Sequence, residues 1–354
     1  MAITIEDVAK ATKVSLSTVS RVLNNTDHPI SEQTRQRVLK IARKLGYRPN
    51  LHAKNLATQS NNTIEVFLDL TYDSAGETGF GSSLNHFLIA ADQVAVKEGF
   101  HVILDITHSR QRNGYNMDMG CIPIAGAMIM SPRQEDTHVE MLANSKIPFL
   151  VVGSSEYNNY SYVDTDNITG ASLALEHLIR LGHTRIACLG GPANFKPSID
   201  RITGYRRALR NHNLIEREEW LETGDWTLSN GYTKMLIILE NTRSDPPTAV
   251  YASNDMLALG AMRAIKSKNI RIPEDIAIVG FDDIPGTEST NPPLTTIRQP
   301  FRETGQLATE ILIRMIKTGY PPKAPYHVLV PPKLVIRRSC GSVVGNTESF
   351  EQAL

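Results

Sequence analysis

The sequence predicts an α/β protein in two parts, a small basic helical head followed by a larger body built on doubly wound parallel sheets. The chain has 354 residues, which is more than one domain usually contains. Residues 1–60 hold ten Lys/Arg and four Asp/Glu, a net +6, although the whole chain has 37 of each type. Beyond residue 61, short apolar runs alternate with helical stretches, which is typical of parallel sheets covered by helices.

The head begins with two short helices. Thr4 and Asp7 have the spacing of a capping box, which predicts that the first helix begins directly after Thr4. A second helix is expected from Leu16 to about Asn24, and at 100° per residue it has two distinct faces. The inner face carries Thr18, Val19 and Val22, and the outer face carries Leu16, Ser17, Ser20 and Arg21.

A third helix is expected between Ser31, which can cap it, and Gly46, which can end it. Its apolar stripe consists of Val38, Ile41, Ala42 and Leu45. Two short helices joined by a tight turn in a basic domain favour a helix-turn-helix, whose second helix enters the major groove of DNA. The alternative for this segment alone is a small helical bundle with ordinary surface charge.

A hinge follows the head. Pro49 biases Arg48 toward extended geometry, and the spacing of Ala53, Leu56 and Ala57 then suits a helix. This helix is too short to persist alone, so we expect it to form on binding DNA, with Leu56 as a wedge between base steps of the minor groove. The alternative is a plain linker.

Four runs in the head, Thr4–Ala9, Val14–Asn24, Gly46–Asn50 and Ala53–Ala57, resemble the lactose-repressor (LacI/GalR) family of bacterial transcription regulators. The resemblance implies that Leu16, Ser17 and Arg21 read bases, and that Leu56 opens the centre of a palindromic operator. The complete set of candidate DNA-binding residues is Leu16, Ser17, Thr18, Ser20, Arg21, Asn24, Tyr47, Asn50, Ala53 and Leu56.

Lys13 departs from this family, which often has glycine at that position. If the turn needs a positive φ there, the lysine costs about 1 kcal/mol.

The body contains seven apolar runs that predict strands, several of them apolar throughout, as in sheets buried on both faces. They are Ile64–Leu70, Val102–Ile106, Ala127–Met130, Phe149–Val152, Ile186–Leu189, Ala249–Ala252 and Ile276–Phe281. The family resemblance continues at Leu175–His183, Asp200–Tyr205, Ser253–Asp255, Ile278–Asp283 and Pro292–Ile297. It implies two lobes like those of periplasmic sugar-binding proteins, at about 61–163 and 164–291, with the stretch from Leu294 to about Ser339 crossing between them.

The expected organisation therefore has four parts. They are a helix-turn-helix head at 1–49, a hinge helix and linker at 50–60, a two-lobed effector-binding and dimerisation domain at 61–340, and a tail at 341–354. The tail lacks a leucine heptad, which favours a homodimer over a tetramer.

Ligands of open α/β sheets bind beyond the carboxyl ends of the strands. Short polar residues follow several predicted strands, and an arginine and a tryptophan lie nearby. The candidate effector-binding residues are Tyr72, Asp73, Ser131, Asn194, Arg201, Trp226, Asn254 and Asp282. The resemblance implies contacts from the four C-terminal members of this set. Val151 stands where sugar-binding relatives can carry an acid, which leaves a ligand other than a sugar open.

Four of these candidates also have a structural interpretation. Asp282 and Asp283 could form a turn after a strand, and Asn254 could cap a helix. Trp226 alone is more often a packing anchor than a ligand platform, and Arg201 alone could be a surface residue. Their shared position at strand ends, together with the resemblance, favours the ligand site.

Several other functions are disfavoured by the sequence. Phosphate-loop, dinucleotide-binding, zinc-protease and serine-hydrolase motifs are lacking, so we expect no enzyme, no cofactor and no metal. Cys121, Cys188 and Cys340 are widely spaced, which indicates reduced thiols in a cytoplasmic protein. There is no signal-peptide pattern at the start and no apolar run long enough to span a bilayer, so no membrane is expected as a partner.

The leading hypothesis is a repressor that binds a palindromic DNA operator under the control of a small effector, a sugar or a sugar derivative. An activator, or a regulator dependent on a co-repressor such as a nucleoside or purine, is the alternative within the same class. A solute-binding protein without a DNA role is the alternative from another class.

Overall fold

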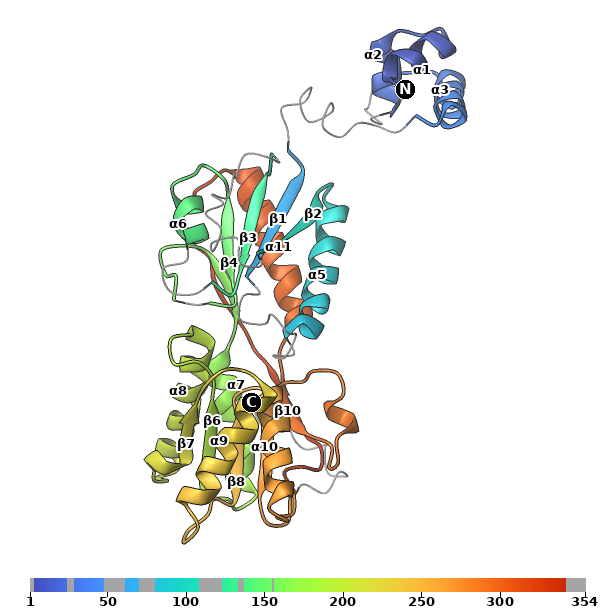
Figure 1. Cartoon of the computed structure of the whole chain (residues 1–354). Coiled ribbons are helices and arrows are strands. Elements are labelled where there is room, and N and C mark those ends of the chain that lie inside the picture. The colour runs from blue at the N-terminus through green and yellow to red at the C-terminus, as the bar shows by residue number, and fades with distance from the viewer. Residues whose placement is uncertain are drawn as a thin grey trace. The chain divides into compact units, whose positions relative to one another are not determined.

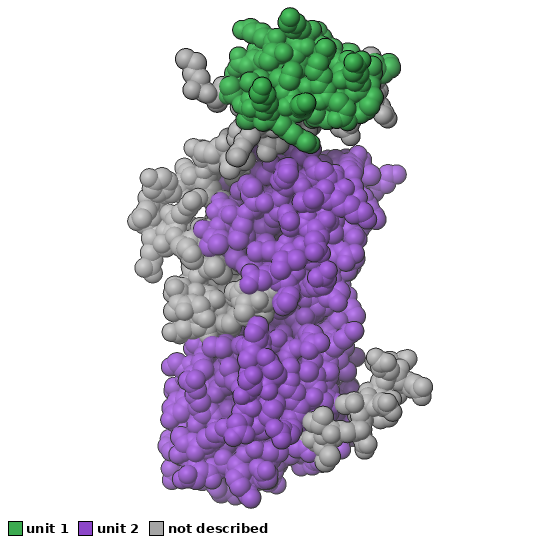
Figure 2. Space-filling view, turned by 90° about the vertical axis from the view of Figure 1, so that its right-hand side faces the viewer, with its two compact units in different colours: residues 1–61 green, residues 62–354 purple. Residues whose placement is uncertain are grey.

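The computed structural model describes residues 3–23, 29–47, 61–69, 80–107, 123–132, 137–154 and 156–341 (Figure 1). The chain divides into two compact units, residues 1–61 and 62–354, which are coloured separately in Figure 2. Six candidate site residues lie outside the described residues: Asn24, Asn50, Ala53, Leu56, Tyr72 and Asp73. The expected hinge and nearly all of the expected tail lie outside them as well.

The head unit holds the three expected helices, α1 (Ile5–Thr12), α2 (Leu16–Leu23) and α3 (Glu32–Leu45). The capping box at α1 is confirmed, because the backbone N–H of Thr4 donates to Asp7 Oδ2 at 2.9 Å and the N–H of Asp7 donates to Thr4 Oγ1. Ser31 caps α3, and Gly46 ends it at a φ of 70°. The head core is formed by Val8, Val19, Val22, Val38 and Ala42.

Lys13 ends α1 in the left-handed region, with φ 54° and ψ 37°. The positive φ considered from the sequence is therefore present, and the lysine Cβ lies close to its own backbone, where glycine would have no such contact.

The body unit consists of two lobes, each with a six-stranded sheet. The first sheet has the order β11-β5-β4-β3-β1-β2, and all of its pairings are parallel. Its strands are β1 (Thr63–Asp69), β2 (His101–Thr107), β3 (Gly126–Met130), β4 (Phe149–Val152), β5 (Tyr162–Thr165) and β11 (His327–Val330). Helices α5 (Phe80–Lys97) and α11 (Phe301–Thr318) pack side by side on one face, and α6 (Thr137–Ala143) packs on the other (Figure 1).

The second sheet has the order β12-β10-β9-β8-β6-β7, in which only the β10–β12 pair is antiparallel. Its strands are β6 (Ile186–Gly190), β7 (Leu221–Thr223), β8 (Ala249–Ala252), β9 (Ala277–Asp282), β10 (Thr295–Arg298) and β12 (Lys333–Val335). Its helices are α7 (Asn167–Arg180), α8 (Lys196–Asn211), α9 (Leu228–Asn241) and α10 (Asp255–Ser267), with single 3-10 turns at Glu218–Trp220 and Thr287–Ser289.

Both faces of this second sheet are buried. Along β8, Val250 and Ala252 pack under α9 and α10, whereas Ala249 and Tyr251 pack under α7 and α8. This alternation explains why the strand reads as apolar throughout, since each face of it meets a helical layer. The predicted doubly wound architecture is confirmed, and all seven predicted strands are present.

The chain crosses between the lobes three times, at residues 165–167, 298–301 and 330–333. The first two crossings are tied together, because Thr165 Oγ1 donates to Gln299 Oε1 at 3.0 Å. Residues far apart in the sequence therefore meet between the lobes. Among the helices that the structure describes, none is both long and apolar enough to cross a membrane.

The strain at Lys13 predicts that Lys13→Gly stabilises the head. Relief of a left-handed backbone contributes up to about 1 kcal/mol, which would slow hydrogen exchange of the buried α1 and α2 amides about fivefold. The measurement is exchange mass spectrometry on the full chain. Lys13→Ala is the matched control, because it removes the long side chain but keeps Cβ. Equal exchange in Lys13→Gly and Lys13→Ala would contradict the backbone explanation.

Candidate functional site

The outer face of α2 is exposed, as its periodicity predicts. Leu16, an apolar residue, is 45% exposed, and Ser17 and Arg21 are exposed beside it, while Val19 and Val22 are buried. Ser20 and Thr18 are half-buried, and the Thr18 hydroxyl contacts Ser15 Oγ at 2.8 Å, at the start of the helix. An exposed face with an apolar group, hydroxyls and a guanidinium carries the contact types that read base edges in a major groove.

Tyr47 has a different environment from the other candidate DNA-binding residues. It is half-buried and packs against the head core just after α3. Burial raises the pKa of its phenol, and the nearby Glu6 charge adds to that effect.

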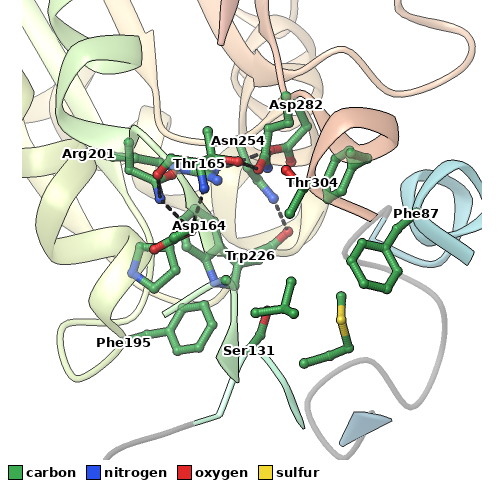
Figure 3. Close-up of a pocket in the computed structure, with 17 residues that line it drawn as sticks. Phe87, Ser131, Asp164, Thr165, Phe195, Arg201, Trp226, Asn254, Asp282 and Thr304 are labelled. Atoms are coloured by element: carbon green, nitrogen blue, oxygen red, sulfur yellow. Dashed lines mark hydrogen bonds and ion pairs between the residues drawn. The ribbon is translucent and has the colours of Figure 1, made fainter. Parts of the chain in front are cut away.

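A cavity lies between the two lobes of the body, at the crossing segments (Figure 3). It is lined from both lobes by Phe87, Met130, Ser131, Val152, Gly153, Asp164, Thr165, Asn167, Phe195, Pro197, Arg201, Trp226, Asn254, Asp282, Gln299, Phe301 and Thr304. Aromatic walls with a few convergent polar groups are typical of small-molecule sites. Five of the eight predicted effector residues are brought together here: Ser131, Arg201, Trp226, Asn254 and Asp282.

Arg201 is buried in the wall of this cavity, with only 5% of its surface exposed. Its Nε donates to Asn167 Oδ1 at 2.8 Å, and its Nη1 donates to the Ser253 carbonyl at 2.6 Å. The same Nη1 pairs with Asp282 Oδ1 at 3.3 Å. The guanidinium also lies 3.8 Å from the ring centre of Phe281. The surface-arginine interpretation is therefore wrong.

Asp282 and Asp283 both have positive φ, at 123° and 59°, and their carboxylates bond to different partners. Asp282 Oδ1 accepts from Gln299 Nε2 at 2.6 Å and faces the cavity. Asp283 instead accepts from Arg298 at 2.6 Å and Arg337 at 2.7 Å. The turn interpretation therefore holds for Asp283, while Asp282 lines the cavity.

The carboxyls around this turn differ in their pKa. Burial raises the pKa of Asp282, although its bonds from Arg201 and Gln299 act in the opposite direction. Burial raises the pKa of Asp255 strongly, and the neighbouring Asp282 charge adds to that rise. Burial also acts to raise the pKa of Asp283, but the bonds from its two arginines outweigh it and the net pKa is lowered.

Asn254 and Trp226 combine structural and cavity-lining positions. Asn254 Oδ1 accepts from the Leu257 backbone at 2.7 Å and so caps α10, while its Nδ2 donates to the Trp226 carbonyl at 3.1 Å. The indole of Trp226 lies so close to Gly191 that a Cβ there would fall 2.4 Å from the ring. Asn254 is therefore both a helix cap and part of the cavity wall, and Trp226 is both a packing residue and part of that wall.

Of two other predicted effector residues, Ser131 reaches the cavity and Asn194 does not. Ser131 lines the cavity in a left-handed conformation, with a φ of 46°, directly after β3. Asn194 is exposed and does not line it, and its neighbour Phe195 does. The turn before α8 therefore presents an aromatic ring rather than an amide to the cavity.

Sequence reasoning missed the cavity residues of the crossings and of α11, above all Asp164. This residue lies near the end of β5 and is 2% exposed. Its Oδ1 accepts from the Thr165 backbone at 2.7 Å, whereas its Oδ2 has no hydrogen-bond partner among the described residues. Burial raises the pKa of Asp164 to about 7, and the Asp200 charge adds to that rise. The available signal was an acid within a short run of strand-forming residues, Tyr162–Thr165.

Two family models match this chain. The model described as bacterial regulatory proteins, lacI family, matches residues 4–50, and that of a periplasmic binding protein-like domain matches residues 175–340. The HTH-type transcriptional regulator CelR of Thermobifida fusca is 31% identical over 345 residues, covering 95% of this chain and 98% of that protein. The HTH-type transcriptional repressor CytR of Escherichia coli K12 is 33% identical over 317 residues, covering 88% and 89%.

Solved structures resemble the fold over nearly its whole length. A lac repressor dimer bound to operator and the anti-inducer ONPF matches with a TM-score of 0.80 and 28% identity, covering 96% of this chain and 99% of that one. A complex of CelR with cellobiose matches with a TM-score of 0.70 and 28% identity, covering 95% and 99%.

The raised pKa of Asp164 predicts a specific loss of stability as pH rises. Its unfolded carboxyl ionises near pH 4, but the folded one keeps its proton until about pH 7. Between these values the folded state binds more protons, so stability falls by up to about 1.4 kcal/mol per pH unit. Asp164→Asn removes this contribution, while those of Asp255 and Asp282 are common to both proteins.

The measurement is urea unfolding of the full chain and of Asp164→Asn at pH 5 to 8. The variant should gain stability relative to the original chain as pH rises. Parallel curves would show that the carboxyl titrates normally in the folded protein.

Proposed function

The chain belongs to the lacI family of bacterial regulatory proteins, and we propose that it represses transcription as a homodimer on a palindromic operator. We propose further that a small hydroxylated effector, a sugar or a nucleoside, controls its operator affinity from the interlobe cavity. In this proposal the operator lies in the bacterial chromosome, so the protein acts in the cytoplasm. The one observation that supports effector control most strongly is the buried Arg201 at the cavity wall.

The DNA part of the proposal is supported by the head. Residues 1–60 carry a net charge of +6, which suits a polyanion, and α2 offers Leu16, Ser17 and Arg21 on one exposed face. The structurally similar lac repressor is a dimer bound to operator. Two heads related by a two-fold axis require two half-sites related in the same way, which is a palindrome.

The effector part is supported by the chemistry of the cavity. Nε and Nη1 of Arg201 bond within the protein, while Nη2 has no such bond to the described residues. Nη2 of Arg201 can donate to a hydroxyl oxygen, carboxylates can accept from hydroxyl groups, and rings such as Phe87 and Trp226 can pack on the apolar face of a sugar. The structure of the related CelR holds cellobiose.

We propose binding rather than turnover at this cavity. The Asp282 carboxylate is held by Arg201 and Gln299 instead of by a nucleophile or a histidine, so it is suited to orienting a ligand.

For the head, we expect Arg21→Ala to weaken binding to sequences selected from a random pool by about 1–3 kcal/mol. Binding to unrelated DNA should change little, because α2 reads base edges while other cations contact phosphates. The measurement is fluorescence anisotropy at several salt concentrations, where log K should fall with log salt. Arg37→Ala, at an exposed position of α3, is the matched control. An equal loss on selected and unrelated DNA, or salt-independent binding, would contradict the proposal.

For the cavity, we expect Arg201→Lys to raise the effector dissociation constant about tenfold to a hundredfold. Lysine has a single nitrogen, so it cannot keep the bonds to Asn167 and Asp282 and also donate to the effector as Nη2 can. The effector is found first by thermal-shift screening, and operator affinity is then measured across its concentration. The direction of the change shows whether it induces or co-represses. Arg206→Lys on the exposed side of α8 is the control. If Arg201→Lys responds at the same effector concentration as the original chain, Arg201 does not bind the effector and the assignment is wrong.

A further inference from the structure

We propose that Asp164 determines the specificity of the interlobe cavity. In this proposal Asp164 Oδ2 accepts a hydrogen bond from a hydroxyl or amino group of the effector, and the charge of the carboxylate excludes effectors that carry a phosphate or carboxylate group. The inference rests on the proposed function, because it requires that the effector bind in this cavity.

The position of Asp164 suits a ligand contact. It lies near the carboxyl end of β5, where the chain begins its first crossing between the lobes, and it lines the cavity (Figure 3). One of its oxygens is fixed, because Oδ1 accepts from the backbone of Thr165 and, at 3.5 Å, from Asn167 Nδ2. These bonds set the direction of the carboxyl group. The other oxygen, Oδ2, is buried and has no hydrogen-bond partner among the described residues.

The neighbouring carboxyls form ion pairs, whereas Asp164 forms none with the described residues. Asp282 is bonded to Arg201 and Gln299, and Asp200 on α8 is paired with Lys196. A buried carboxylate with no ion-pair partner and one unbonded oxygen is costly, and native proteins seldom retain such a group without a use. Its elevated pKa, which has burial as its main cause, reflects the same cost. A donor brought by a ligand would satisfy Oδ2 and offset that cost.

The charges that line the cavity favour an uncharged or cationic ligand. Its described lining holds one cation, Arg201, and two carboxyls, Asp164 and Asp282. With both carboxyls ionised the lining is negative by one charge, and charges in a site of low dielectric interact strongly. Thr304 Oγ1, on α11 of the first lobe, is a second buried polar atom without a hydrogen-bond partner among the described residues. Hydroxyl groups can satisfy both atoms, whereas a phosphate or carboxylate offers no donor to Asp164.

The experiment compares three matched pairs of probes: cellobiose with cellobionate, glucose with glucose 6-phosphate, and adenosine with adenosine monophosphate. Binding to the full chain is measured by calorimetry at pH 8, where Asp164 is ionised. We expect at least one uncharged probe to bind, at least tenfold more tightly than its anionic partner. Asp164→Asn should weaken binding of the uncharged probe about tenfold to a hundredfold. It should also reduce the difference in affinity between that probe and the anionic probe of the same pair.

Asp166→Asn is the matched control, because Asp166 caps α7 two residues away and asparagine caps helices equally well. It should leave affinity and discrimination unchanged. Asp164→Thr is the second variant, used if Asp164→Asn does not fold, and it should show the same loss.

The outcomes separate this inference from the function on which it rests. If an uncharged probe binds equally to the original chain and to the Asp164 variants, the specificity role is overturned while the effector site stands. Tighter binding of the anionic partner to the original chain would also overturn it. If no probe binds the original chain, the proposed effector class fails, and the inference fails with it.

Discussion

The arrangement of the body depends on one buried cation, the guanidinium of Arg201. A charge removed from water must be paired and hydrogen-bonded, and here the partners come from three separate segments. Asn167 belongs to the first crossing, the Ser253 carbonyl follows β8, and Asp282 ends β9. The ring of Phe281 covers one side of the cation. Satisfying this group therefore fixes the carboxyl ends of two neighbouring strands against the crossing.

The acids near Arg201 show how a crowded set of charges is kept stable. Asp255 is fully buried and bonds to the Ile284 backbone and the Thr296 hydroxyl, which holds the turn after β9 in place. The left-handed conformations of Asp282 and Asp283 then direct their carboxylates to different cations. The two members of this dipeptide therefore have different surroundings: Asp283 joins β9 to the arginines of later segments, and Asp282 faces the cavity.

Local rules allowed much of the fold to be predicted. The capping box at Thr4, the positive φ at Lys13 and the two faces of α2 follow from interactions within a few residues. Apolar runs revealed the central strands because each is buried on both faces. The strands β5, β7, β10, β11 and β12 were not predicted, since they are short or carry polar residues at the edges and crossings.

The candidate site was harder to predict, because its membership depends on topology. Asp282 follows from its place at the end of a strand and Arg201 from its place in the helix after β6, together with the resemblance to the lactose-repressor family. Gln299 and Thr304 reach the cavity only because the chain returns to the first lobe after β10, which no local pattern reveals. Asn194 shows that the sequence does not predict the position to the exact residue, since the neighbouring Phe195 lines the cavity with its ring while the Asn194 amide is exposed.

The position of the cavity also gives the physical requirement for a switch. A ligand shifts an equilibrium between two conformations only by the difference in its affinity for them. Phe87 and Thr304 line the cavity from the first lobe, and Arg201 and Trp226 line it from the second. A molecule that contacts both sides binds with a free energy that depends on the separation of the lobes. The three crossings are the segments that a change in that separation must bend. Gln299 lies in one of these crossings and Asp164 directly precedes another, so groups that line the cavity belong to, or adjoin, the segments that would move.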